Sequence, residues 1–182
     1  MNLGETYVLD GIDRQLLEAL QGDSKRSLKE IGAEVGLSAP SVMERVRKLE
    51  NAGIIKGYHA LLDARKVGLD IAAFIGVSIS NPAHLSAFEE WVESIPQVLE
   101  CHHVTGGHTL LLKVKTRNTK DLEQLISRVR SMEGAASTET MVVLSTHTER
   151  VEVALPVSEP APEARRRKRP RRKPDPATQE VS

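Results

Sequence analysis

Apolar residues recur every three or four positions in three stretches of the first third of the chain, at 12–20, 28–35 and 42–49. This spacing places the apolar side chains on one face of an α-helix, which must bury that face against something. We therefore predict three short amphipathic helices, the third running from about Ala39 to Ala52.

Residues that commonly start helices precede each stretch. Asp10 or Asp13 is suited to cap the first helix, and "SLKE" at 27–30 is the capping-box pattern for the second. Ser38 can cap the third helix, and Pro40 fits its first turn, where the backbone amide has no partner in any case. The sequence therefore predicts where each helix begins.

Only a short turn, "EVGLS" at 34–38, joins the second and third helices, which is helix-turn-helix spacing. The stretch "IIKGYHALL" at 54–62 follows a glycine and has the composition of a strand. We therefore predict a winged helix-turn-helix domain over residues 1–62.

The period of the apolar pattern then changes. Alternating apolar residues at 71–79 predict a strand, and a helix is expected to begin near Pro82. Two strand-like runs around Gly106-Gly107 predict a hairpin. A helical stripe at 122–129 and a last strand, "STETMVVLST", complete the order β-α-β-β-α-β, which is the ferredoxin-like arrangement.

The end of the chain has a third composition, rich in proline and charge, with almost no bulky apolar residue after Val157. Such a segment cannot bury enough apolar surface to offset its ordering entropy, so we expect it to be disordered. The expected fold class is α+β. The expected divisions are the DNA-binding domain at 1–62, a linker at 63–70, the ferredoxin-like domain at 71–153 and a disordered basic tail at 154–182.

Composition narrows the functional classes. Aromatic residues make up 3% of the 182 residues, too few for a protein that binds nucleic acid by stacking bases on aromatic rings. No apolar run approaches the roughly 20 residues of a membrane span, and the N-terminus lacks the basic and apolar regions of an export signal. The single cysteine, Cys101, excludes an internal disulfide and suits a reducing compartment. We expect a cytoplasmic, nucleoid-associated protein with no membrane partner and no cofactor.

Charge is distributed unevenly along this formally neutral chain. Residues 161–182 carry eight basic and three acidic side chains, so the rest of the chain has a net charge of −5. A run of cations can hold DNA phosphates without reading sequence, through release of counterions. A solubilising end, or a segment that folds back on the acidic body, are the alternatives. The predicted phosphate contacts are Arg165, Arg166, Arg167, Lys168, Arg169, Arg171, Arg172 and Lys173.

The third helix carries the candidate DNA-reading residues. In helix-turn-helix proteins, the N-terminal end of the second helix of the pair lies at base edges in the major groove. Small residues there suit a close approach, and basic residues follow on the outward face. A solvated face with ion pairs such as Glu44–Lys48 is the alternative. The predicted DNA contacts are Ser38, Pro40, Ser41, Arg45 and Lys48, with Arg47 as a further phosphate contact.

Cys101, His103 and His108 raise the question of a metal site, because the first two share a strand face and the third lies across the turn. Their spacing fits no standard zinc motif. We therefore predict no metal and assign these residues to sheet packing and interface hydrogen bonding.

The motifs "LDGID", "LSAPSVMERVRKLENAGII" and "GY" closely resemble the DNA-binding half of the Lrp/AsnC (feast/famine) transcription regulators. "ECHHVTGGHTLLLKV" resembles the ligand-sensing domain of the same family, of the RAM/ACT type, so the resemblance covers about Val8 to Val153. It implies a homodimer formed through the second domain, often assembled into an octamer. It also implies an effector, usually an amino acid, near the hairpin turn at Thr105, Gly106, Gly107, His108 and Thr109.

The turn departs from the common pattern of the family. Members often have acidic residues where this chain has Gly107, His108 and Thr109, and a carboxylate is what would hold the ammonium group of an amino acid. Another ligand, binding through backbone groups, or no ligand at all are the alternatives.

The resemblance also admits an enzyme, because some similar chains decarboxylate haem precursors such as sirohaem. The second domain offers few arginines for the carboxylates of a tetrapyrrole. We therefore predict a sequence-specific DNA-binding regulator rather than an enzyme, with an architectural, DNA-wrapping protein as the main alternative.

Overall fold

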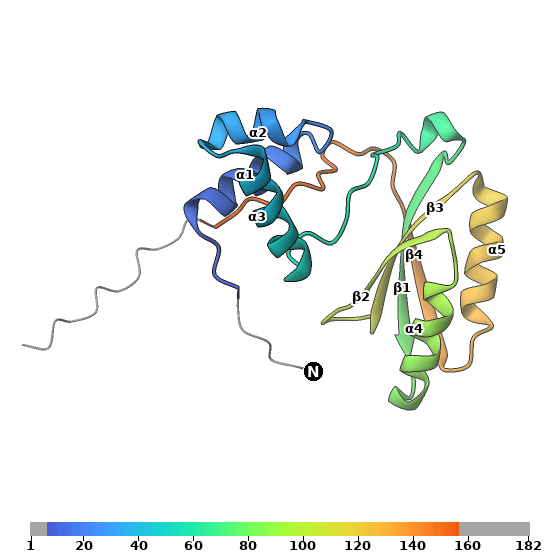
Figure 1. Ribbon diagram of the computed structural model, residues 1–182. Coiled ribbons are helices and arrows are strands. Elements are labelled where there is room, and N and C mark those ends of the chain that lie inside the picture. The colour runs from blue at the N-terminus through green and yellow to red at the C-terminus, as the bar shows by residue number, and fades with distance from the viewer. Residues whose placement is uncertain (1–6, 157–182) are drawn as a thin grey trace, which may run out of the picture. The chain divides into compact units, whose positions relative to one another are not determined.

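The computed structural model describes residues 7–156, which belong to two compact units (Figure 1). Of the described residues, 7–55 and 151–156 form the helical unit, and Lys56–Arg150 form the sheet unit. Residues 56–62 therefore group with the sheet unit, although the sequence assigned them to the DNA-binding domain. Residues 151–153 group with the helical unit, although the sequence assigned them to the ferredoxin-like domain. Most of the basic tail lies outside the described residues.

The helical unit consists of α1 (Gly11–Gly22), α2 (Leu28–Val35) and α3 (Ala39–Asn51). Asp10 and Asp13 together form a capping box at α1, so both candidate caps are used. The predicted capping box at α2 and the Ser38 cap at α3 are confirmed. Local side-chain hydrogen bonds thus fix the start of all three helices.

The turn between α2 and α3 depends on Gly36, whose φ of 72° lies in the left-handed region that glycine adopts without strain. The turn brings the apolar faces of the helices together around a small core, as predicted from their spacing. This core cluster comprises Leu16, Ile31, Val42 and Val46.

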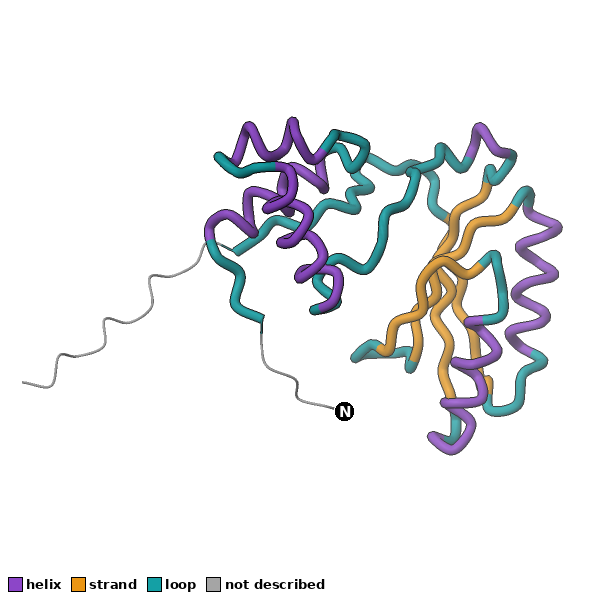
Figure 2. The backbone as a smooth tube through the Cα atoms, viewed as in Figure 1, coloured by secondary structure: helices purple, strands orange, loops and turns teal. Residues whose placement is uncertain are grey.

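The strand predicted over 54–62 is not formed. Residues 56–62 have no regular secondary structure and are exposed (Figure 2). A strand is stabilised by a neighbouring strand that takes its backbone hydrogen bonds, and the described part of the chain offers none here. The DNA-binding unit is therefore a helix-turn-helix without the predicted wing strand.

The sheet unit has the predicted β-α-β-β-α-β order. Its four antiparallel strands are arranged β2-β3-β1-β4, with β1 and β3 at the centre. A 3₁₀ turn at Pro82–His84 precedes the first helix. The elements are β1 (Ile71–Ile79), α4 (Leu85–Glu93), β2 (Val98–His103), β3 (Leu110–Thr116), α5 (Thr119–Arg130) and β4 (Ala135–Val142).

Both helices, α4 and α5, cover the same face of the sheet (Figure 1). Alternate residues of the central strands point into the core beneath them, including Ile75 on β1 and Leu112 on β3, which pair in the ladder. Phe88 of α4 is fully buried in the same core. No α-helix of the described residues covers the opposite face of the sheet, which we call the open face. Within residues 7–156, every helix is too short to span a membrane.

Candidate nucleic-acid interface and effector turn

The N-terminal end of α3 presents small side chains outward. Ser38 and Pro40 are exposed and Ser41 is half-buried. The hydroxyls of Ser38 and Ser41 lie 2.8 Å apart, and the amide of Ser41 donates to Ser38 Oγ. This end of the helix is therefore compact, and its hydroxyls are already ordered by each other before any ligand arrives.

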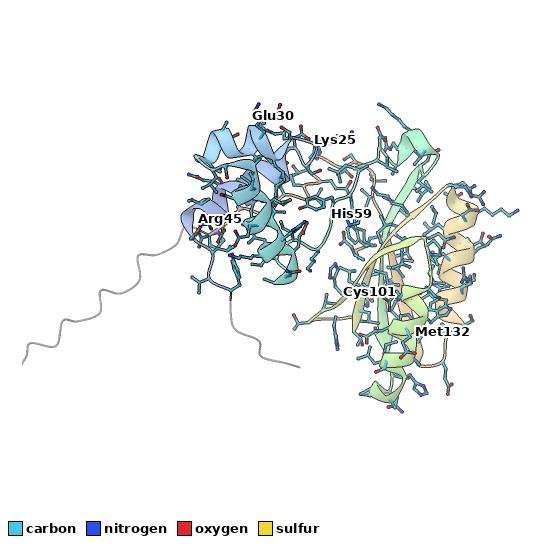
Figure 3. The ribbon with its side chains drawn as sticks, viewed as in Figure 1. Lys25, Glu30, Arg45, His59, Cys101 and Met132 are labelled. Atoms are coloured by element: carbon cyan, nitrogen blue, oxygen red, sulfur yellow. The ribbon has the colours of Figure 1, made fainter. Side chains whose placement is uncertain are left out.

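Arg45, predicted to contact DNA, is held inside the helical unit instead of standing free. Its Nη1 donates to Asp10 Oδ2 and to Asp13 Oδ1, each at 2.7 Å. Figure 3 labels Arg45 among the side chains of the helical unit. The Arg45 side chain is 30% exposed, and that of Asp13 only 3%. We call this group of three residues the Arg45 clamp. It joins the middle of α3 to the start of α1.

The charges of the clamp stabilise one another. The Asp10 carboxylate, followed by that of Asp13, raises the pKa of Arg45 above its usual value. The backbone amide of Asp13, followed by the Arg45 side chain, lowers the pKa of Asp10. A buried carboxylate is costly unless it is paired and hydrogen-bonded, and Asp13 meets both conditions because Tyr7 also donates to it, at 3.2 Å.

A shallow cavity of about 450 Å³ lies between the segment before α1 and the outward face of α3. Tyr7 and Val8 line one side, and the other side includes Ser41, Glu44 and Lys48. The segment before α1 therefore flanks the same face of α3 on which the DNA contacts were predicted.

The two other basic residues of α3 differ in their surroundings. Lys48 pairs with Glu44 at 2.8 Å, which raises the pKa of Lys48, and both side chains are well exposed. This is the i, i+4 pair that the sequence offered as an alternative interpretation. Arg47 is exposed, and no described residue forms an ion pair or hydrogen bond with it. Among the described residues, Arg47 is thus the basic side chain of α3 that has no partner to give up on meeting a phosphate.

The predicted effector residues, Thr105 to Thr109, lie in the connection between β2 and β3, which we call the effector turn. Thr105, Gly106 and Gly107 are exposed, whereas His108 and Thr109 are half-buried. Thr109 is committed to the sheet, since its hydroxyl accepts from the amide of Ile79 at 3.0 Å. The exposed part of the turn thus offers backbone groups and one hydroxyl rather than charged side chains.

His108 lies against the open face of the sheet. A Cβ added to Gly76 would come within 2.4 Å of the His108 ring, so the ring rests directly on the backbone of β1. Nε2 of His108 is 2.9 Å from Glu139 Oε2, and Nδ1 is 3.5 Å from Ser78 Oγ. His108 therefore joins the turn to β1 and β4.

Strand register separates the residues that raised the question of a metal. Cys101 and His103 pair across the ladder with Leu112 and Leu110, whose side chains are buried under the helices. Paired residues point to the same face, so Cys101 and His103 lie on the helix-covered side. His108 lies on the opposite face. The sequence raised the possibility that these three side chains meet, and they do not, because the sheet stands between them. Among the described residues no group of three potential metal ligands converges.

Sequence analysis did not identify the partners of Arg45 and His108, which are Asp13 and Glu139. Asp13 was treated only as a cap, although it lies within the apolar stripe of α1, where an acidic residue signals a buried partner. The pairing of Glu139 with His108 follows from the register of β4 on β1, which no local pattern reveals.

The open face of the sheet mixes apolar and charged side chains. Phe74 is half-buried and Met141, its neighbour across the ladder, is 45% exposed. Lys113 binds Glu100 at 3.0 Å and Glu149 at 2.9 Å. An apolar centre beside ion pairs is the usual composition of a protein–protein interface.

Comparison with known proteins agrees with both units. The family described as "AsnC-type helix-turn-helix domain" matches residues 9–50, and that described as "Lrp/AsnC ligand binding domain" matches residues 72–153. Both matches end before the basic tail.

Individual relatives extend over nearly their whole length. The HTH-type transcriptional regulator FL11 of Pyrococcus horikoshii is 33% identical over 147 residues, which is 81% of this chain and 97% of that protein. The structure of Escherichia coli AsnC matches with a TM-score of 0.75 at 30% identity, covering 80% of this chain and 99% of the other. The transcriptional regulator NMB0573 of Neisseria meningitidis, in complex with L-Met, matches with a TM-score of 0.77 at 28% identity, covering 81% and 97%.

These relatives carry the same two units in the same order, and they are transcriptional regulators rather than enzymes. The chain therefore belongs to the Lrp/AsnC family of helix-turn-helix transcriptional regulators.

Proposed function

We propose that α3 reads operator DNA with the small residues at its N-terminal end, Ser38, Pro40 and Ser41, and holds flanking phosphates with Arg47 and Lys48. The observation that carries this proposal is the exposed, compact start of α3 in a helix-turn-helix unit, the part of such units that enters the major groove. Arg45 has a different role: its two carboxylate partners commit it to positioning α3 on α1.

A salt series separates contact from positioning. Each phosphate contact that is removed should reduce the dependence of log K on log salt by about one. We expect this for Arg47→Ala and for Lys48→Ala. For Arg45→Ala we expect an unchanged slope and a lower unfolding temperature of the helical unit. A reduced slope with unchanged stability in Arg45→Ala would show instead that Arg45 contacts DNA. Gln15→Ala, at an exposed position of α1, is the matched control.

We propose that the open face of the sheet forms the homodimer. Dimerisation would cover Phe74, Leu111 and Met141 and would pair two helix-turn-helix units for adjacent half-sites. Phe74→Glu should yield a monomer by light scattering, because a buried carboxylate without a partner opposes association. A dimer that persists in Phe74→Glu and in Met141→Glu would place the interface elsewhere. The same light-scattering measurement on the parent chain shows whether dimers assemble further, up to an octamer.

We propose that a small-molecule effector binds at residues 105–109, where the exposed backbone of Gly106 and Gly107 is available. The L-Met complex of the Neisseria relative supports an amino acid as the first ligand to try. Titration calorimetry with the amino acids, followed by light scattering, tests whether binding changes the assembly state. An unaltered assembly in the presence of a bound ligand would contradict ligand-controlled assembly.

We propose that the tail adds a sequence-independent grip on DNA. The tail carries eight cations at 165–173, whereas the chain before residue 161 has a net negative charge, and this concentration of positive charge supports a phosphate partner. Removal of residues 158–182 should weaken binding to all DNA sequences about equally and flatten the salt dependence. A salt dependence that survives the truncation would contradict this role.

A further inference from the structure

The segment that leads into the tail is bound to the helical unit. Residues 151–156 follow the sheet unit in the chain, yet they run along α1 (Figure 1). The Gln21 side chain donates from Nε2 to the carbonyl oxygen of Val153 at 3.2 Å, and Gln21 Oε1 accepts from the amide of Val153 at 2.8 Å. One primary amide thus satisfies both backbone groups of Val153, which a glutamine of this reach can do and a charged or apolar side chain cannot.

A second contact fixes the direction of the segment. Arg14 donates from Nη1 to the carbonyl oxygen of Pro156. Arg14 and Gln21 lie two turns apart on α1, about 10 Å along its axis, and three extended residues from Val153 to Pro156 span about the same length. The segment therefore runs antiparallel to α1 and ends towards the start of that helix. We call residues 151–156 the strap.

The start of α1 is where Asp10 and Asp13 hold Arg45 of the recognition helix. The chain thus leaves the strap at the end of α1 that is joined to α3. Eight residues, 157–164, separate Pro156 from the first cation, Arg165. They can span at most about 28 Å, at roughly 3.5 Å per residue, which is about eight base pairs of DNA.

We infer that the strap on α1 delivers the basic tail to the DNA phosphates beside the half-site that α3 of the same chain contacts. This rests on the proposed functions of α3 and of the tail. The strap shortens the flexible tether between the folded part of the chain and the first cation. With the strap bound, the tether runs from Pro156 to Arg165, which is nine residues. Without it, the tether runs from Glu149, the last ion-paired residue of the sheet unit, which is 16 residues. Effective concentration falls roughly as the 3/2 power of tether length, so loss of the strap should weaken tail-dependent binding about two- to threefold.

Directed cleavage of DNA tests the placement. A full-length chain carrying Cys101→Ser and Ala164→Cys is labelled at position 164 with a chelated iron that cuts nearby DNA strands. A footprint on the same fragment locates the half-site. We expect cuts within about eight base pairs of the protected half-site, and cuts that are weaker and more widely spread in Gln21→Ala. Gln15→Ala, on the same helix but away from the strap, should match the parent chain.

The outcomes separate this inference from the proposed function. A protected half-site with a cleavage pattern that Gln21→Ala leaves unchanged would overturn the strap's role alone. Uniform cleavage with no protected site would overturn both. Affinity provides a second readout: Gln21→Ala should lose about two- to threefold in the full chain and nothing in a chain that ends at residue 156. Equal losses in both chains would show that Gln21 acts on the helical unit itself and would contradict the inference.

Discussion

The helical unit and the sheet unit are held together in different ways. The sheet unit has a continuous apolar core between two helices and four strands, in which Phe88, Ile75 and Leu112 are fully buried. The helical unit has a much smaller apolar cluster, and the orientation of α3 on α1 depends in addition on the Arg45 clamp. Where the core is small, charged groups on its rim take part in positioning the elements. A basic residue on the recognition helix is therefore not by itself evidence of a DNA contact.

The largest effect should come from the core of the sheet unit. Phe88→Ala removes a fully buried ring that packs 5.7 Å from Trp91. Such truncations cost about 3–5 kcal/mol. Denaturant unfolding followed through the Trp91 fluorescence should show this loss. A cost below about 1 kcal/mol would mean that the sheet unit is not organised around this core.

The next effect should come from the clamp. Asp13→Ala removes the buried partner of Arg45 and one half of the capping box of α1, at an expected cost of about 3 kcal/mol. Circular dichroism of thermal unfolding measures it. Asp23→Ala, which removes an exposed carboxylate that follows α1, is the control. Equal stability of the two variants would show that the clamp does not hold the helical unit together.

An intermediate effect is expected where the turn rests on the sheet. Gly76→Ala places a Cβ 2.4 Å from the His108 ring, so the ring must move and the unit should lose about 1–3 kcal/mol. The double variant Gly76→Ala with His108→Ala should lose less than the two single changes added together. Strict additivity would mean that the ring does not rest on Gly76.

The smallest effect concerns pH. The pKa of Asp10 lies below its unfolded value of 3.8, chiefly because the Asp13 amide donates to it. The folded state therefore binds this proton less readily than the unfolded state does, and the stabilisation is complete above about pH 4 and lost as the pH falls further. Asp10→Asn should be less sensitive to pH than the parent in that window. Identical pH profiles would show that Asp10 does not contribute to the pH dependence of stability.

Local signals in the sequence were sufficient for most of the fold. Capping residues and apolar periodicity located α1, α2 and α3, and the change of period identified the sheet unit. The strand at 54–62 was predicted wrongly, because a strand pattern does not supply the neighbour that completes its hydrogen bonds. The clamp was beyond reach for a related reason: Asp13 and Arg45 are 32 positions apart, and only the packing of α3 on α1 brings them together.

The same limit applies to the effector turn and to the strap. The turn was located from its glycines, but the contact of His108 with Glu139 depends on strand register. Residues 154–156 were assigned to the disordered tail, and nothing in their composition reveals that the segment is bound to α1, because Arg14 contacts only the backbone of Pro156.

If α3 is positioned to read DNA sequence, the protein must prefer some DNA fragments strongly over others. The most direct test is the ratio of affinities of the full chain for a fragment selected from genomic DNA and for random DNA, measured at about 150 mM salt. We expect a preference of about a thousandfold or more, the usual range for specific regulators. A ratio near one would contradict it, and the protein would then cover DNA without regard to sequence, as an architectural protein does.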